Sequence, residues 1–442
     1  MSWKKVRLGD ILKQYRIEHR VADKAIYKQV SILNDGSVVL RGEKIGKEIG
    51  RKRQFIIDTK KYPNTLIFTR QLLLQGSIGI ASDDVHTCIV TENMPMFSID
   101  TAKINKEFLI LFLKSEVFKS RIREIELSGS AQKSIHERTF LNLEFSFPQF
   151  QIQKEIVVEL LKLKGNSDNI TTELTHQLTL VKNLRQQLLQ DAVQGKLVEQ
   201  NKKDEPASEL LKKIKAEKEK LIAEKKLKKE KELPPIKVEE IPFEIPPNWV
   251  WCRLGEICNY GSSPKSEPKS LDYDTWVLDL EDIEKETSNL LCKIRFNERN
   301  SLSTKSKFKQ GEVLYSKLRP YLDKVIVADE DGVCTTEILP LKLYGGLNPF
   351  FIRFTLKSIA FLKYVNSVTK GMKMPRLGTT DGQIALIALP PLAEQNRIVQ
   401  KLDELMQYCN ELEASIKQSE SQNEKLLQQV LREALRKEPV EV

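Results

Sequence analysis

The sequence predicts an α+β protein: two mixed α/β domains in tandem, separated and joined by two long helices that pack as an antiparallel coiled coil with pseudo-two-fold symmetry. Three observations predict this fold class. The chain of 442 residues repeats itself at a spacing of about 245 positions. Each copy begins with short apolar runs separated by Gly and Pro, which is typical of strands and turns. Each copy ends in a long stretch without proline, in which apolar residues have heptad spacing.

The repeat keeps its order along the chain. Arg7–Asp10 (RLGD) returns as Arg253–Glu256 (RLGE), and Thr65–Thr69 (TLIFT) returns as Glu312–Ser316 (EVLYS). Further matches follow with nearly the same shift: Thr91-Glu92 with Thr336-Glu337, and Gln186–Leu189 with Gln428–Leu431. A period this long indicates two whole domain-plus-helix units rather than a solenoid of short repeats. We therefore expect two similar surfaces on one chain.

The strand-rich parts are expected at 1–150 and 236–390. Short apolar runs within them predict strands, and longer amphipathic runs predict helices. The expected strands are Leu66–Phe68, Ile78–Ile80, Met96–Ile99, Val313–Tyr315 and Val325–Val327. The expected helices are Phe108–Ile125 and Phe351–Val365. Gly42, Gly46 and Gly50 recur every four residues between charged positions and predict a mobile loop.

Long helices are expected at about 152–193, inside a central region 151–235, and at about 392–436, inside a distal region 391–442. One seam is expected on each helix, because residues spaced alternately by three and four recur in both copies at one phase. The apolar seam residues are Leu160, Leu163, Ile170, Leu174, Val181, Leu184, Leu188, Leu402, Leu405, Leu412, Ile416, Leu426 and Val430. The polar seam residues, which can fix the register, are Ser167, Gln177, Cys409, Ser419 and Asn423. The alternative is that each helix only covers its own domain.

A charged connector fills the rest of the central region. Glu205-Pro206 and the acidic residue that follows predict the start of another helix. Ile214, Leu221 and Leu227 give that helix only a thin apolar stripe. Prolines at 234–235, 242 and 246–247 then predict an extended tether. Two interpretations stay open, a solvated linker and a docking surface for another protein.

The composition narrows the class of protein. Lys plus Arg is 71 and Asp plus Glu is 61, so the net charge is +10. This excess mildly favours a polyanionic partner, although a lysine-rich proteome would produce it too. The six cysteines have neither C-x-x-C spacing nor nearby partners for zinc, so free thiols are expected. Without a signal peptide or an apolar run long enough to span a membrane, the protein is expected to be soluble and cytoplasmic.

Motifs for chemistry on this chain are missing. Gly42–Lys47 resembles a phosphate-binding loop but is one residue short, and Glu48 stands where Ser or Thr is required. Asn348–Phe351 (NPFF) resembles the base-holding motif of amino-group DNA methyltransferases but lacks the second proline. Its counterpart in the first copy, Asn105, also precedes an expected helix, so both asparagines are predicted to be helix caps. We expect no catalytic residue, no metal and no cofactor on this chain.

Basic, polar and glycine residues gather at expected loops of both domains. Lys and Arg bind phosphates, and Arg, Gln, Asn and Ser can also contact base edges. One such group alone is more often solvated surface, but corresponding groups in both copies favour a nucleic-acid interface. The expected DNA-binding residues of the first domain are Arg41, Lys44, Lys47, Arg51, Lys52, Arg53, Arg70, Gln71, Ser130, Gln132 and Lys133. Those of the second domain are Ser262, Ser263, Lys265, Lys317, Arg319, Tyr321, Lys370, Lys373 and Arg376.

Together these features resemble the specificity subunit of Type I restriction–modification systems over nearly the whole chain. The segments that carry the resemblance are Trp3–Asp10, Trp249–Glu256, Gly311–Tyr321, Gly371–Arg376, Glu205–Ile222 and Leu389–Gln395 (LPPLAEQ). The last of these, which leads into the distal helix, is the most specific. The first copy departs from it and has Phe147–Gln153 (FPQFQIQ).

The resemblance implies that the strand-rich parts are target-recognition domains, each contacting one half of a bipartite double-stranded DNA target. The paired helices would set the distance between the half-sites. The chain itself would be non-catalytic and would position two methyltransferase subunits, which bind S-adenosylmethionine and methylate adenine. It also implies up to two restriction subunits, which use ATP and Mg²⁺ to cleave DNA.

Two other functions stay open on the residues alone. One is a self-sufficient DNA methyltransferase or nuclease, and the other is a protein-interaction scaffold without DNA binding. Neither the target bases nor the spacer length follows from the sequence, because base contacts depend on loop geometry. For the same reason the sequence does not separate the loop residues that contact bases from those that contact phosphates.

Overall fold

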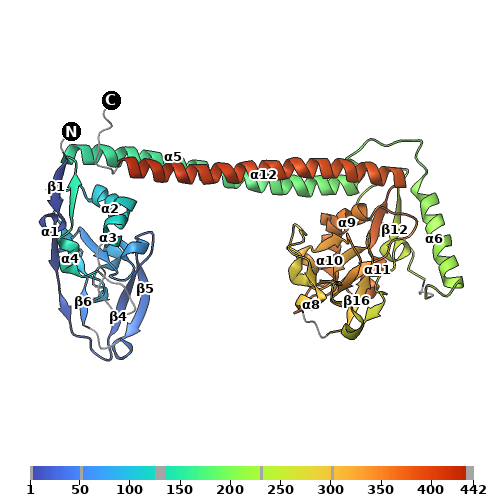
Figure 1. Ribbon diagram of the computed structural model, residues 1–442, viewed down its shortest axis with the longest axis horizontal. Coiled ribbons are helices and arrows are strands. Elements are labelled where there is room, and N and C mark those ends of the chain that lie inside the picture. The colour runs from blue at the N-terminus through green and yellow to red at the C-terminus, as the bar shows by residue number, and fades with distance from the viewer. Residues whose placement is uncertain (1–2, 50–52, 125–134, 229–231, 300–302, 435–442) are drawn as a thin grey trace. The chain divides into compact units, whose positions relative to one another are not determined.

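The computed structural model describes residues 3–49, 53–124, 135–228, 232–299 and 303–434. It divides into two compact units, residues 1–175 with 417–442 and residues 176–416. Each unit contains one α/β domain together with a stretch of both long helices (Figure 1). The division therefore passes through the long helices.

The domain of the first unit contains three small sheets. The ribbon β1-β11 and the four-stranded sheet β2-β10-β7-β8 are antiparallel, and the five-stranded sheet β3-β6-β9-β4-β5 is mixed, with β4 parallel to β9. The strands are β1 (Lys4–Arg7), β2 (Leu12–Tyr15), β3 (Glu18–His19), β4 (Ile26–Ile32), β5 (Val38–Ile45), β6 (Gln54–Ile56), β7 (Thr65–Phe68), β8 (Ile78–Ile80), β9 (Ile89–Thr91), β10 (Met96–Ile99) and β11 (Glu144–Phe147). The helices are α1 (Leu8–Ile11), α2 (Lys106–Lys114), α3 (Glu116–Arg123) and α4 (Glu137–Leu141).

The domain of the second unit repeats this plan. Its sheets are β12-β21, β18-β17-β20 and β13-β16-β19-β14-β15, with β14 parallel to β19. The strands are β12 (Val250–Arg253), β13 (Lys265–Ser266), β14 (Trp276–Leu278), β15 (Ile294–Arg295), β16 (Lys305–Phe308), β17 (Val313–Ser316), β18 (Val325–Val327), β19 (Gly332–Cys334), β20 (Ile338–Leu341) and β21 (Leu386–Leu389). The helices are α7 (Leu254–Ile257), α8 (Phe296–Arg299), α9 (Pro349–Lys357), α10 (Ile359–Val368) and α11 (Thr379–Ile384). The shared strand order confirms the predicted repeat and the α+β fold class.

The five predicted strands are confirmed, but the two predicted domain helices are each split in two. A serine separates the halves in both copies, Ser115 between α2 and α3 and Ser358 between α9 and α10. Each hydroxyl accepts a hydrogen bond from the backbone N–H three residues later, that of Phe118 or Phe361, at 3.3 Å. A serine in this position starts a new helix because its side chain satisfies a free N–H of the first turn.

A polar cluster at the start of each long helix ties that helix to its domain. Asn105 and Asn348 cap α2 and α9 as predicted, and their side chains accept from the N–H groups of Phe108 (2.8 Å) and Phe350 (3.0 Å). Their own backbone N–H groups donate to the buried side chains of Gln153 (2.9 Å) and Gln395 (3.0 Å).

Each glutamine also donates back to the proline that ends the preceding strand. Gln153 bonds the Pro148 carbonyl at 2.8 Å, and Gln395 bonds the Pro390 carbonyl at 3.0 Å. One amide therefore links a strand end, a helix cap and the first turn of a long helix. The first copy keeps this glutamine although the surrounding motif has changed.

The long helices α5 (Phe150–Val193) and α12 (Leu392–Ala434) pack against each other and run antiparallel (Figure 1). In the first unit the Asn423 amide donates to the Ser167 carbonyl (3.1 Å) and to the Thr171 hydroxyl (3.2 Å). In the second unit Arg185 forms an ion pair with Glu413. The alternative that each helix covers only its own domain is therefore wrong, and Asn423 is positioned to fix the register as predicted.

Part of the predicted seam faces solvent. The seam residues Leu160, Val181, Leu402, Cys409 and Ile416, all one position of the heptad, are buried. At the other heptad position Leu163, Ile170, Leu184, Leu412 and Leu426 remain 39–61% exposed, so the paired helices do not enclose them. A pair of helices buries only a narrow strip, so flanking apolar residues stay open unless another element covers them.

The connector is docked on the second domain, so the solvated-linker interpretation is wrong. The predicted helix is confirmed as α6 (Ala207–Ala223). Leu210, Leu211 and Ile214 are buried in the core of the second domain. The Lys218 ammonium donates to the Gly255 carbonyl at 2.7 Å. The apolar stripe, although thin, is enough to bind the helix to its own chain.

The tether after α6 covers the outer face of the β12-β21 ribbon. The Arg253 guanidinium donates to the carbonyls of Pro234 (3.2 Å) and Pro235 (3.1 Å) and lies 2.6 Å from Glu240. This hydrogen bond lowers the pKa of the Glu240 carboxyl. The Arg253 side chain is 4% exposed, whereas its counterpart Arg7, on the equivalent ribbon of the first domain, is 52% exposed.

A lysine at the end of the first domain helix anchors a loop in each copy. The Lys114 ammonium donates to the Asp35 carbonyl at 2.6 Å. Its counterpart Lys357 is buried and donates to the Glu286 carbonyl (2.8 Å) and to the Asp323 carboxylate (2.7 Å). Burial raises the pKa of Asp323 to about 6 even though Lys357 acts in the opposite direction. This pair fixes the end of the loop at 317–323.

None of the helices in the described ranges has the length and apolar character that a bilayer crossing requires. Within the same ranges, no three His, Cys, Asp or Glu side chains gather closely enough to hold a metal ion. The six cysteines are free thiols, and five of them are buried.

Replacing Gln395 with Leu is expected to destabilise the second domain by about 2–4 kcal/mol, because the partly buried Asn348 N–H and the buried Pro390 carbonyl lose their partner. Urea unfolding followed by tryptophan fluorescence measures this, since Trp249, Trp251 and Trp276 all lie in that domain. Gln400→Leu, at an exposed site on the same helix, is the matched control. Equal stabilities of the two variants would contradict the role assigned to Gln395.

Replacing Lys357 with Met is expected to cost about 3–5 kcal/mol at pH 7.5, because the buried Asp323 carboxylate loses the ammonium group that bonds it and keeps only the more distant charge of Arg353. The loss should be smallest below about pH 6, where the Asp323 carboxyl is protonated with or without the lysine. The loss of stability should grow as the pH rises above about 6. In wild type the Asp323 carboxyl then ionises, whereas in the variant it must keep its proton to stay buried. Urea unfolding at pH 5.5 and 7.5 tests this, with the exposed Lys363→Met as control; a pH-independent loss would refute it.

Candidate nucleic-acid interface

Two predicted basic loops of the second domain form one surface. The segment after β17, 317–322, lies against the segment 370–377 that leads to α11. The Arg319 N–H donates to the Pro375 carbonyl at 2.8 Å, and the Leu377 N–H donates to the Lys317 carbonyl at 3.0 Å. The lysine anchor at Asp323 holds the end of the first loop. The structure thus brings together residues that lie far apart in the sequence.

The cations of this loop pair differ in whether an acidic side chain of the domain already binds them. The Arg376 guanidinium is held by Glu337, with N–O distances of 3.1–3.3 Å. Lys317, Arg319, Lys370 and Lys373 form no ion pair with any residue in the described ranges. Free cations on a shared rigid loop pair are suited to binding phosphates, because no internal bond has to break.

Exposed apolar side chains accompany these cations. Tyr321, Met372 and Met374 are each about half exposed on the same two loops. Tyr321 belongs to the predicted interface, whereas the two methionines were not among the expected site residues. Large apolar side chains that remain open beside free cations indicate a contact surface, since they stabilise nothing inside the domain.

The other predicted residues of the second domain lie on the segment before and within β13. The Ser262 carbonyl accepts from the Asn259 side chain at 2.6 Å, and the neighbouring Gly261 lies against Thr379 at the start of α11. Ser263 is partly buried. The Lys265 ammonium donates to the Ser306 hydroxyl at 2.8 Å. Ser262 therefore lies near the second of the two basic loops, whereas Lys265 is engaged within its own sheet.

The first domain contains the same loop pairing with a different charge pattern. The Ile135 N–H donates to the Arg70 carbonyl at 3.3 Å, as Leu377 does to Lys317 in the second domain. The Arg70 side chain, 18% exposed, forms an ion pair with Glu137. Burial alone would raise the pKa of Glu137, but the hydrogen bond from Arg70 and the charges of Arg70 and Arg16 outweigh it and hold the pKa below its usual value. The predicted contact of Arg70 with DNA would require this pair to open.

Other predicted residues of the first domain lie on or near strand β5. The expected mobile loop is wrong at Gly42 and Gly46, because β5 covers 38–45 and a 3₁₀ turn follows at 46–48. Arg41, Lys44 and Lys47 are exposed there, Gln71 is exposed after β7, and Arg53 lies 4.0 Å from Glu18. Gly50, Arg51, Lys52, Ser130, Gln132 and Lys133 lie outside the described residues.

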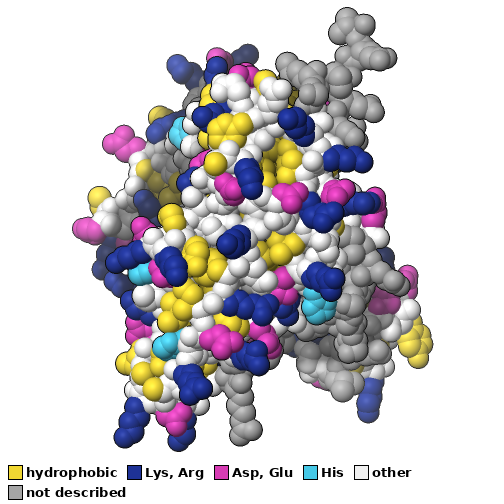
Figure 2. Space-filling view, turned by 90° about the vertical axis from the view of Figure 1, so that its left-hand side faces the viewer, with side chains coloured by type: hydrophobic (Ala, Val, Ile, Leu, Met, Phe, Trp, Pro, Cys, Tyr) yellow, Lys and Arg dark blue, Asp and Glu magenta, His cyan; other side chains and the backbone are white. Residues whose placement is uncertain are grey.

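Figure 2 shows Lys and Arg side chains spread over the visible face and interspersed with Asp and Glu. No single continuous basic patch covers that face. On that face, therefore, no dense field of positive charge marks an interface.

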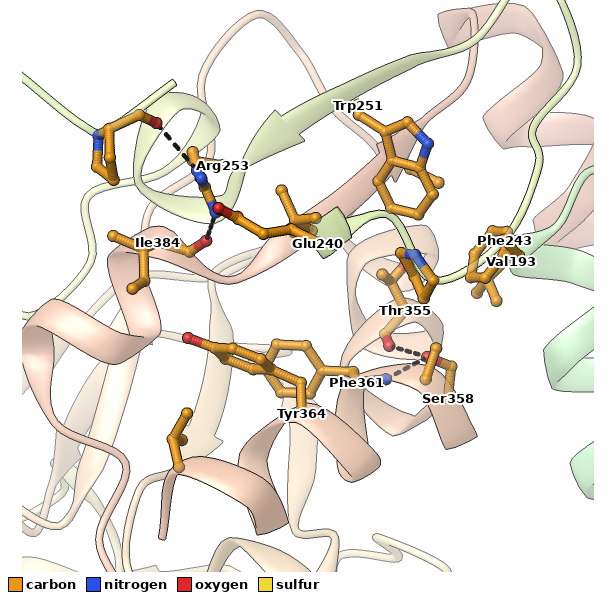
Figure 3. Close-up of a pocket in the computed structure, with 16 residues that line it drawn as sticks. Val193, Glu240, Phe243, Trp251, Arg253, Thr355, Ser358, Phe361, Tyr364 and Ile384 are labelled. Carbon is orange, nitrogen blue, oxygen red and sulfur yellow. Dashed lines mark hydrogen bonds and ion pairs between the residues drawn. The ribbon is translucent and has the colours of Figure 1, made fainter. Parts of the chain in front are cut away.

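The second domain also contains an apolar cavity of about 340 Å³ between the tether and the β12-β21 ribbon. Trp251, Phe361 and Tyr364 surround it, with Arg253 and Glu240 at one edge (Figure 3). Its polar groups are already bonded: Arg253 to Glu240 and the Ile384 carbonyl, and the Tyr364 hydroxyl to the Asp381 carbonyl. Among the described residues that line it, no acid, base and nucleophile stand together free of other partners.

Sequence comparison identifies relatives over most of the chain. The family described as the Type I restriction modification DNA specificity domain matches residues 1–180 and 246–419. The specificity subunit of the Escherichia coli Type I restriction enzyme EcoAI is 31% identical over an alignment 406 residues long, which covers 78% of this chain and 65% of the relative. That of EcoEI, also from Escherichia coli, is 27% identical over 78% of this chain and 66% of its own length. The chain thus spans slightly less than two thirds of these two relatives.

Solved structures show the same fold. The crystal structure of the HsdS subunit from Thermoanaerobacter tengcongensis superposes with a TM-score of 0.54 at 18% identity, covering 98% of this chain and 96% of that one. The matched residues occupy both domains and both long helices, where the duplicated anchors and the paired loops lie. Because the family model matches residues 1–180 and 246–419, well over half of the sequence, the chain belongs to the family of Type I restriction modification DNA specificity domains.

Proposed function

We propose that this chain is the non-catalytic DNA-recognition subunit of a Type I restriction–modification enzyme and binds a bipartite double-stranded target. The observation that carries the proposal is the duplicated loop pair, 70–71 with 135 and 317–322 with 370–377, on two domains of one chain. A DNA partner suits the free cations of the second copy. Because the two domains have diverged, the two half-sites are proposed to differ in sequence.

The long helices are proposed to set the spacing of the half-sites. They contain 44 and 43 residues, about 65 Å each at 1.5 Å per residue. One turn of B-DNA is about 34 Å, so helices of this length can separate two contacts by more than one turn. An antiparallel pair that joins two like domains also suits the local two-fold symmetry of a duplex.

The exposed apolar rows of α5 and α12 are proposed to bind two methyltransferase subunits, which would supply S-adenosylmethionine and adenine methylation. Leu163, Ile170, Leu184, Leu412 and Leu426 stay exposed on helices that are otherwise paired. Such rows usually mark a protein interface. Up to two restriction subunits with ATP and Mg²⁺ are proposed as further partners, and the cytoplasm as the location.

Methylation mapping in the source cells tests the whole proposal. Deleting this chain should abolish adenine methylation at one bipartite motif and leave all other motifs modified. Methyl transfer by the purified chain without partners would favour the self-sufficient methyltransferase instead. Purified complexes that bind partners but never DNA would favour the scaffold.

Replacing Lys317, Lys370 and Lys373 together with Ala is expected to weaken DNA binding by a similar factor for every duplex. The slope of log affinity against log salt should become shallower by about 0.9 for each phosphate that the protein no longer neutralises. Fluorescence anisotropy of the complex with target and scrambled duplexes measures both the affinity and its salt dependence. The salt is varied over about 50–200 mM, the range in which phosphate contacts dominate. Lys363→Ala is the matched single-cation control; an unchanged slope in the triple variant would remove these residues from the interface.

Replacing Leu184 and Leu412 with Gln is expected to weaken methyltransferase binding at least roughly tenfold, because two apolar side chains no longer gain from burial. The free chain should keep its stability, since both leucines are already largely exposed. Isothermal titration with the methyltransferase subunit and urea unfolding give the two readouts. Leu291→Gln, at an exposed leucine elsewhere in the second domain, is the control, and equal affinities for the two variants would rule this row out.

A further inference from the structure

Comparing the two copies of the repeat shows which structural features the domains share and which occur in only one of them. The loop pairing that joins 317–322 to 370–377 has a counterpart in the first domain. A feature common to two domains that contact different half-sites cannot by itself distinguish those half-sites. Base discrimination must therefore depend on elements in which the copies differ.

The connection between two neighbouring strands of the five-stranded sheet is such an element. In the first domain, β4 and β5 form a long hairpin with seven paired positions, Ile26 opposite Ile45 to Ile32 opposite Val38. In the second domain the equivalent β14 and β15 share two pairs, and residues 279–293 lie between them. That segment contains five acidic residues and two lysines, whereas 26–45 contains three cations and two acids.

The hairpin is open to solvent along its outer strand. β5 is the edge of its sheet, and all residues from Val39 to Ile45 are exposed, so neither face of that stretch covers a core. Ile26, Leu40 and Ile45 are 65%, 47% and 47% exposed. The hairpin lies on the side of the domain away from α5 (Figure 1). Large apolar side chains left open on an edge strand indicate a contact surface.

A bulge directs one side chain of this hairpin. Gln29 pairs with Gly42 and Val30 with Leu40, so Arg41 is the extra residue. Gly42 has φ +140°, a conformation that side chains rarely adopt, and open space where a Cβ would lie. Bulges redirect the inserted side chain out of the regular alternation of a strand. Arg41, Lys28 and Lys44 form no ion pair with the described residues, unlike Arg70.

We propose that the β4-β5 hairpin enters the major groove and contacts the bases of one half-site, with Arg41 at the bulge as the residue that discriminates between base pairs. A two-stranded ribbon fits this groove, and Arg bonds guanine bidentately. Ile26, Leu40 and Ile45 provide apolar contact for thymine methyl groups, and the shared loop pairs bind phosphates. This inference rests on the proposed function of the chain.

The test measures methylation by the full chain assembled with its methyltransferase subunits. Substrates are the mapped target duplex and a set in which each position of both half-sites is changed singly. Arg41→Ala should reduce discrimination at one or two adjacent positions of one half-site, roughly 5-fold to 100-fold. The other half-site should be recognised as before. Arg41→Lys should resemble Arg41→Ala there, because an ammonium group cannot make the bidentate contact.

The controls separate the possible failures. Lys13→Ala removes an exposed cation from β2 of the same domain and should leave every preference unchanged. The inference is wrong if Arg41→Ala keeps every sequence preference. It is also wrong if Arg41→Ala lowers methylation equally on all duplexes and Arg41→Lys restores it, because the arginine then contacts no base. If the wild-type assembly shows no sequence preference in either half-site, the proposed function fails and this inference fails with it.

Discussion

A buried glutamine in the first turn of each long helix connects that helix to its domain. Gln153 and Gln395 each accept from a capping asparagine and donate to a proline carbonyl. The side-chain amide both accepts and donates, so an apolar residue of similar volume would leave a partly buried N–H and a buried carbonyl without partners. The ribbon strand, the domain helix and the long helix meet at this point in both copies, so the geometry of each unit depends on it.

The two copies share the buried polar residues that hold the fold together and differ in their exposed loops. The capping asparagines, the serines that split the domain helices and the lysines at Lys114 and Lys357 all recur. The charged groups beside the paired loops differ: Arg70 is bound to Glu137 in one copy, and Arg376 to Glu337 in the other. Strand order and helix attachment are thus maintained by buried polar bonds, while the solvent-facing loops are free to diverge.

Most of the architecture could be predicted from the sequence because it depends on local pattern. Apolar runs located five of the strands, heptad spacing located α5 and α12, and the shift between copies revealed the repeat. The asparagine caps were predictable because a cap is defined by its neighbours in the chain. The splits at Ser115 and Ser358 were missed because a serine inside an amphipathic run looks like an ordinary polar position.

The features that sequence reasoning missed depend on residues far apart in the chain. Strand β5 lacks alternation because both of its faces are exposed, so its glycines suggested a loop. The partner of Arg70 is 67 positions away, and no pattern links the two. Exposure of Leu163 and Leu412 could not be foreseen, since spacing alone does not reveal how wide a strip the partner helix covers. Met372 and Met374 could have been noticed as large apolar residues in a basic loop.

The docked tether makes the two halves of the chain unequal as folding modules. On the first ribbon Arg7 is solvated and faces Glu144. On the second ribbon the tether encloses the equivalent Arg253, and the Trp251 and Phe243 rings lie tilted against each other with centroids 5.0 Å apart. A fragment that began at the second ribbon would lose this cover, together with the apolar side chains of α6. Autonomous folding of the C-terminal half therefore requires residues that, by position in the chain, belong to the central region.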